Sequence, residues 1–126
     1  MNRDLLLRQF RPTWLGHILE CHPVLASTND RARPLLDELG PEAHGAVVFA
    51  DEQTGGRGRL GRSWQSPRGL GLACSVALWV DRCPGGMPPI QLAGSLAILS
   101  ALRETTGVHG RLKWPNDVLL DGKKVC

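Results

Sequence analysis

Residues 53–64 have the sequence QTGGRGRLGRSW, and this stretch lies between two apolar segments of the chain. Its four glycines let the backbone turn freely and approach a ligand closely. Its arginines, Arg57, Arg59 and Arg62, carry planar guanidinium groups that pair with phosphate or carboxylate. The stretch therefore predicts an anion-binding loop, although a solvated basic loop or an RNA-binding segment explains the composition equally well. It matches neither a Walker A loop nor a dinucleotide-binding fingerprint.

Apolar segments on both sides of this loop predict a sheet. Residues 46–50 form a continuous apolar run, which is typical of a strand buried on both faces. A second apolar run over residues 72–80 predicts the next strand. Residues 15–25 predict a further, short and imperfect strand.

A helix is expected after residue 26. Ser27, Thr28 and Asn29, followed by Asp30, are typical N-cap residues whose side-chain oxygens bond the open N–H groups of a first helical turn. Apolar residues then recur at helical spacing up to residues 40–41, a Gly-Pro pair. Pro34 lies inside this pattern and predicts a shortened, delayed or kinked helix. The three polar side chains could also bind a neutral urea or amide group, and the two roles do not exclude each other.

The second half of the chain predicts one long helix and short strands. A proline- and glycine-rich linker over residues 81–88 precedes a helix over residues 89–106, which Gly107 ends. One face of this helix is expected to carry Leu92, Leu96, Leu99 and Leu102. Strands over residues 111–114 and 118–120 follow, and the Asp-Gly pair at 121–122 predicts a hairpin turn. The last strand has barely begun at Cys126, which suggests a truncated fragment.

Strands and helices alternate irregularly, which predicts an α+β fold, a mixed sheet with helices packed on one side. A second chemical motif, KWPND over residues 113–117, ends one of the expected strands. Lys113 places a point charge at the sheet edge, where it can bind a carboxylate or a phosphate. Asn116 and Asp117 would turn the chain or help hold Mg²⁺, and a plain turn explains them equally well.

The overall composition is that of an ordinary globular protein. The 126 residues are 42% hydrophobic and 21% charged, with a net charge of +3, which is too small to predict a nucleic-acid partner. The longest apolar stretch is too short for a membrane helix, and the N-terminus lacks the features of a signal peptide. We therefore expect a cytoplasmic protein. The four cysteines and four histidines lack zinc-ligand spacing, so no structural zinc is expected.

Three blocks in this order, STN at 27–29, QTGGRGRxGRxWxSPxG at 53–69 and KWPNDVxLxxxK at 113–124, resemble biotin protein ligases. The resemblance covers the N-terminal part of that family's catalytic domain and implies a biotin/lipoate ligase-like fold, related to class II aminoacyl-tRNA synthetases. It implies residues 15–126 as the N-terminal portion of the domain, the family continuing beyond this point. Residues 1–14 are expected to form an N-terminal arm, because they contain Pro12 and show no clear periodicity. Because Pro34 departs from the family pattern, a displaced helix start is expected.

The resemblance also implies an activity. Members of the family activate biotin with ATP and Mg²⁺ to biotinyl-5′-AMP, then transfer biotin to a lysine of a carrier domain of acetyl-CoA carboxylase or a related carboxylase. No helix-turn-helix precedes the first block, so no DNA binding is expected; no membrane partner is expected either, and a homodimer is compatible with the family. A non-catalytic biotin-binding fragment and a related lipoate-type ligase are the alternatives.

Site residues follow from the resemblance position by position. The biotin site would comprise Ser27, Thr28, Asn29, Gln53, Arg57, Gly58, Arg59 and Lys124. The ATP phosphates would be bound by Arg57, Arg59, Arg62 and Lys113, of which Arg59 and Lys113 are the expected catalytic residues. Asp117 would bind the metal, and Trp64 would become ordered with the loop and exclude water.

Overall fold

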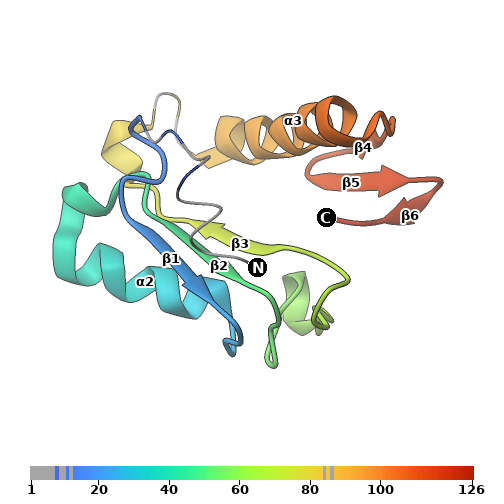
Figure 1. Cartoon of the computed structure of the whole chain (residues 1–126). Coiled ribbons are helices and arrows are strands. Elements are labelled where there is room, and N and C mark those ends of the chain that lie inside the picture. Colours follow the sequence, from blue (N-terminus) through green and yellow to red (C-terminus); the bar gives the residue numbers. More distant parts are fainter. Residues whose placement is uncertain (1–7, 9–10, 12, 84, 86) are drawn as a thin grey trace. The chain divides into compact units, whose positions relative to one another are not determined.

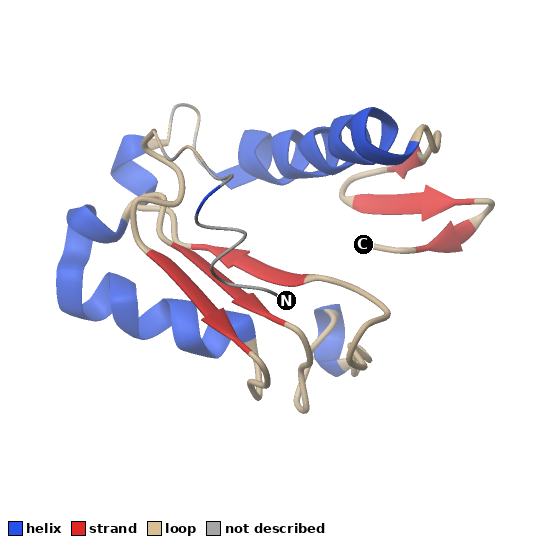
Figure 2. Ribbon diagram, viewed as in Figure 1, coloured by secondary structure: helices blue, strands red, loops and turns tan. Residues whose placement is uncertain are grey.

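A computed structural model describes the chain except residues 1–7, 9–10, 12, 84 and 86 (Figure 1). The expected arm over residues 1–14 therefore lies largely outside the described residues. The chain divides into two compact units, Met1–Arg82 and Cys83–Cys126, and each is described by itself. Each unit combines a small sheet with one longer helix (Figure 2), so the predicted α+β class is confirmed.

The first unit contains a mixed sheet of three strands in the order β1-β2-β3, formed by Leu19–His22, Val47–Ala50 and Ala73–Val76. β1 runs parallel to the central strand β2, whereas β3 is antiparallel to it. Val48 in β2 is fully buried, as the continuous apolar run over residues 46–50 predicts. β3 is shorter than the predicted strand over residues 72–80: four of its residues pair with β2, and Ala77 continues the contact through backbone hydrogen bonds with Gly45 and Ala46. Val80, the last residue of that run, begins a short 3₁₀ helix, Val80–Arg82.

Helix α2, Thr28–Leu39, supplies the other side of this core. Its Ala32 and Leu35 are buried in a cluster with Ala43, Val48 and others. Pro34 lies inside the helix, yet α2 begins directly after Ser27 and continues to Leu39, so the expected displacement of the helix start is wrong. The apolar contacts on either side of the proline compensate for the hydrogen bond that it cannot donate.

The turns around α2 fix where β2 begins. Gly40, with φ of +54°, ends α2, and a 3₁₀ helix, Gly40–Ala43, leads into the sheet. Gly45 has φ of +92°, and a Cβ at this position would overlap the carbonyl oxygen of Trp14. Trp14 also stacks on His44 with a ring-centroid distance of 5.1 Å.

The second unit contains helix α3, Met87–Thr106, and an antiparallel sheet of three strands, β4 (Arg111–Lys113), β5 (Asp117–Leu120) and β6 (Lys123–Lys124). Asp121 and Gly122 both have positive φ, +49° and +78°, which is the geometry of the predicted Asp-Gly hairpin turn. No helix among the described residues is long and apolar enough to cross a membrane.

The face of α3 differs from the prediction in one position. Leu96 is 51% exposed, whereas the neighbouring Ser95 is only 4% exposed. The Ser95 hydroxyl lies within hydrogen-bonding distance of two carbonyl oxygens, that of Gln91 one turn earlier and that of Asn116 before β5, at 3.1 and 3.2 Å. A small polar residue therefore links the helix to the turn of the KWPND motif.

Candidate functional site

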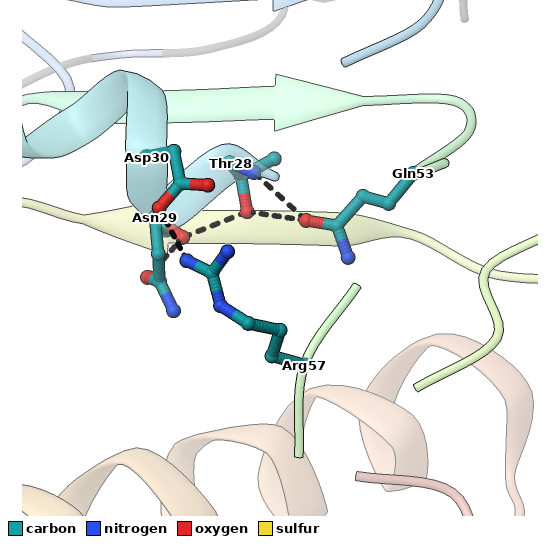
Figure 3. Close-up of polar contacts among 6 residues, drawn as sticks. Thr28, Asn29, Asp30, Gln53 and Arg57 are labelled. Carbon is teal, nitrogen blue, oxygen red and sulfur yellow. Dashed lines mark hydrogen bonds and ion pairs between the residues drawn. The ribbon is translucent and has the colours of Figure 1, made fainter. Parts of the chain in front are cut away.

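Four side chains from three distant segments meet at the start of α2 in the first unit (Figure 3). They are Thr28, Asn29, Gln53 and Ser75, and we call them the α2 polar cluster. The backbone N–H of Thr28 donates to Gln53 Oε1 at 2.8 Å, and the Thr28 hydroxyl lies 3.0 Å from the same oxygen. Ser75 Oγ lies 2.7 Å from Thr28 Oγ1 and donates to Asn29 Oδ1 at 2.7 Å. Thr28 and Ser75 are buried, so these contacts are shielded from water.

The backbone holds Gln53 in this position. Gln53 forms a parallel bridge with Leu25 on one side and an antiparallel bridge with Ser66 on the other. Its side-chain oxygen accepts the Thr28 N–H, one of the orphan donors that open a helix. Ser27 occupies the N-cap position with extended backbone but makes no capping hydrogen bond with its side chain. The predicted capping by Ser27 is therefore wrong, and a side chain from a residue beyond β2 takes that role.

The arginine-containing loop is a hydrogen-bonded hairpin rather than a freely solvated segment. Its two arms are joined by Gln53 N–H to Ser66 O at 3.1 Å, by Trp64 N–H to Gly56 O at 2.9 Å, and by Gly58 N–H to Arg62 O at 2.7 Å. The tip is the short 3₁₀ turn Arg59–Gly61. A Cβ on Gly56 would overlap the Trp64 carbonyl oxygen, so the close approach of the arms requires glycine there. The base of the hairpin, including Gln53 and Trp64, borders a cavity of about 340 Å³.

Arg57 extends from this hairpin toward α2. Its Nη2 atom donates to Asp30 Oδ1 in a short ion pair between two exposed side chains (Figure 3). The hydrogen bond from Arg57 lowers the pKa of Asp30, and the same bond raises the pKa of Arg57. Gly58 follows in the hairpin, Arg59 lies at its tip, and Arg62 is exposed on the returning arm.

The remaining predicted residues lie in the second unit. Lys113 ends β4 and is the register partner of Asp117 in β5. Lys124 in β6 donates from Nζ to Asp117 Oδ1 at 2.7 Å. The antiparallel sheet thus places Lys113 opposite Asp117 in the strand register and brings the Lys124 ammonium to the Asp117 carboxylate.

Asp117 is the residue predicted to bind Mg²⁺. Mg²⁺ prefers an octahedron of oxygen ligands. Asp117 is already ion-paired with Lys124, and the described residues contain no group of three or more His, Cys, Asp or Glu side chains that could hold a metal. The metal-binding role of Asp117 stays a prediction.

Two residues of these hydrogen-bond networks belong to none of the sequence motifs. Ser75 lies in an apolar strand and Ser95 in an apolar helix, and both are buried. A small hydroxyl residue that interrupts an apolar run was the available signal, but its partners lie far away in the sequence. Asp30 was recognised only as part of the helix start.

Comparison with known proteins places the chain in a family. The model of the Biotin/lipoate A/B protein ligase family matches residues 22–126. The chain belongs to this family. It is 39% identical over 110 residues to the bifunctional ligase/repressor BirA of Bacillus subtilis, covering 87% of this chain and 33% of that protein. It is 35% identical over 109 residues to the biotin–[acetyl-CoA-carboxylase] ligase of Mycobacterium tuberculosis, covering 82% of this chain and 41% of that protein.

Solved structures of this ligase family have the same fold. The biotin protein ligase of Aquifex aeolicus in complex with biotin and ATP matches with a TM-score of 0.71 and 37% identity, over 86% of this chain and 44% of that one. The Leishmania major biotin protein ligase in complex with biotin matches with a TM-score of 0.74 and 28% identity, over 86% and 48%. The resemblance seen in the sequence and the biotin/lipoate ligase-like fold are thus confirmed. The chain spans between a third and a half of these relatives' lengths.

Proposed function

We propose that the chain is the N-terminal portion of a biotin protein ligase catalytic domain and contributes the biotin-binding side of its site. The α2 polar cluster carries this proposal. Its hydroxyl and amide groups, two of them buried, are suited to a neutral ligand group that both donates and accepts hydrogen bonds. The urea ring of biotin is such a group. Ser27, buried next to Thr28, belongs to the same proposed site.

The reaction that we propose has two steps. A carboxylate oxygen of biotin attacks the α-phosphorus of ATP, and the bond to the leaving pyrophosphate breaks, which gives biotinyl-5′-AMP. The amine of a carrier-domain lysine then attacks the acyl carbon, AMP leaves and an amide forms. Neither step needs a nucleophile from the enzyme, because catalysis depends on positioning two anions and stabilising charge at phosphorus.

The family resemblance assigns that task to basic side chains in each unit. Arg57 and Arg62, with Arg59 and Gly58 at the hairpin tip, would bind the substrate carboxylate and phosphates. Lys113 would bind the ATP phosphates, and Lys124 the biotin carboxylate region. Trp64 would help exclude water from the adenylate. A Mg²⁺ ion would arrive with the ATP phosphates, and a carboxylase carrier domain is the proposed protein partner.

The first experiment measures binding and activation separately. Calorimetry of the chain with biotin and with lipoate should show binding of biotin only. Incubation with biotin, ATP and Mg²⁺ should then release pyrophosphate, and addition of a carrier domain should yield a biotinylated lysine. Binding without pyrophosphate release would support a non-catalytic biotin-binding fragment instead, and preference for lipoate would support a lipoate-type ligase. Absence of biotin binding by the folded chain would contradict the proposal.

The second experiment tests the proposed catalytic residues. Arg59→Ala and Lys113→Ala should each lower the rate of adenylate formation at least about a hundredfold, which is typical of losing a group that stabilises transition-state charge. Arg103→Ala and Lys123→Ala remove the same charges at exposed positions of α3 and β6 and should leave the rate unchanged. Equal rates in all four variants would rule out these roles.

A further inference from the structure

The ion pair between Asp30 and Arg57 links the arginine hairpin to the first turn of α2. Only one contact joins them, from Arg57 Nη2 to Asp30 Oδ1. A guanidinium carries five N–H donors, so this bond leaves most of them available. Among the described residues, the Arg57 side chain forms its hydrogen bond and its ion pair with Asp30 alone. The arginine is therefore anchored at one atom while its other donors remain open to a ligand.

The backbones of Asp30 and Arg57 are both held in place by secondary structure. Asp30 lies in the first turn of α2, where the helix dipole favours a negative charge. The Arg57 backbone is bridged to Ser63 across the hairpin, and the next residue, Gly58, donates to Arg62 O at 2.7 Å. With both backbones fixed, the long Arg57 side chain is the variable part. The carboxylate of Asp30 restricts it to the side of the hairpin that faces α2 (Figure 3).

Stability does not explain the pair. Arg57 and Asp30 have side chains that are 60% and 49% exposed, and ion pairs this exposed contribute little to folding. An anchored guanidinium near a binding site favours anion binding, because a side chain that is already restricted loses less conformational entropy when it binds an anion. The pair lies next to Asn29 of the α2 polar cluster, the proposed ligand site (Figure 3).

We infer that Asp30 is a positioning residue, which holds Arg57 beside the α2 polar cluster so that its remaining donors meet the anionic group of the substrate. This inference rests on the proposed function. The carboxylate of the substrate binds alongside Asp30, on the open donors, and does not displace it. Removing the Asp30 charge therefore weakens the binding of an anionic ligand. If Asp30 instead competed with the ligand for Arg57, removing its charge would strengthen the binding.

The test compares biotin with biotinamide, which keeps the urea ring but lacks the negative charge. Asp30→Asn should weaken biotin binding by about tenfold, the size expected for a coupled charged contact, and leave biotinamide binding unchanged. Asp37→Asn is the matched control, since Asp37 is an exposed acid of the same helix, and it should change neither. In an Arg57→Gln background, Asp30→Asn should have no further effect. Tighter biotin binding by Asp30→Asn, unchanged binding, or equal weakening of both ligands would each overturn the inference.

A measurement without ligand separates this inference from the proposed function. The ¹⁵N-labelled guanidinium of Arg57 should show slow exchange and restricted rotation in the free chain, and both should be lost in Asp30→Asn but not in Asp37→Asn. If the folded chain binds neither biotin nor biotinamide, the proposed function fails. The guanidinium signals then decide the positioning role alone, and signals that do not respond to Asp30→Asn overturn it.

Discussion

Replacing Ser75 by alanine tests the α2 polar cluster most directly. The Ser75 hydroxyl makes two contacts of 2.7 Å, one with Thr28 Oγ1 and one with Asn29 Oδ1, and the residue is 8% exposed. Each hydrogen bond contributes about 1 kcal/mol net. Thr28 retains Gln53 as a partner and Asn29 is exposed to water, so neither group is left fully unsatisfied. We therefore expect Ser75→Ala to lower the free energy of unfolding by about 1–2 kcal/mol.

Urea denaturation measures this change. With a slope near 2 kcal/mol/M, the midpoint should fall by about 0.5–1 M without a change of slope. Ser63→Ala is the matched control, because Ser63 is exposed in the same unit, and it should shift the midpoint by less than about 0.25 M. Equal shifts in the two variants would refute the reasoning that the buried hydroxyl stabilises the start of α2.

Ligand binding provides the second measurement on Ser75→Ala. Misaligning Thr28 and Asn29 at a cost near 1.4 kcal/mol corresponds to about tenfold weaker biotin binding. A variant that is destabilised but binds biotin with unchanged affinity would show that the cluster supports only the fold.

Three further predictions concern other parts of the two units. Gly56→Ala should force the hairpin arms apart at the Trp64 carbonyl and reduce biotin affinity by at least about tenfold in calorimetry, whereas Gly71→Ala, which meets nothing within 4 Å, should have no effect. Ser95→Ala should lower the free energy of unfolding by about 1–2 kcal/mol in urea denaturation, because it removes the buried link from α3 to the turn before β5. The pKa of Glu20 is lowered in the folded chain: partial burial opposes this shift, and the hydrogen bonds from Arg31 and His22 cause it. Glu20 should therefore contribute stability that is present above its unfolded pKa and is lost as the pH falls through its lower folded pKa. Urea midpoints at pH 7 and pH 3.5 should therefore differ less in Glu20→Gln than in the unchanged chain.

Local signals in the sequence predicted the elements that depend on neighbouring residues. The apolar run at residues 46–50 gives a buried strand, Gly40 ends α2, and the Asp-Gly pair at 121–122 turns the last hairpin. Each of these features is specified within a few residues. The exception is Pro34, whose local effect was overruled by the packing of α2 on the sheet.

The partners of the candidate site could be predicted only in part. The family motifs indicated Thr28, Asn29, Gln53 and Arg57, and the structure places these residues around the start of α2. Ser75 and the capping role of Gln53 depend on how β3 and the hairpin align with α2, which no short pattern encodes. The exposed Leu96 beside the buried Ser95 has the same origin, because the turn before β5 decides which side of α3 is covered.

The wide sequence separation within the α2 polar cluster has a consequence for how the protein folds. Gln53 lies 25 positions after Thr28, and Ser75 lies 47 positions after it. Contacts between residues so far apart in the sequence form slowly, because the chain loses loop-closure entropy before these contacts stabilise it. During synthesis, α2 therefore emerges from the ribosome well before the side chains that complete its first turn. The α2 polar cluster is therefore completed late in folding, and a nascent chain that stops short of β3 contains the helix without the complete cluster.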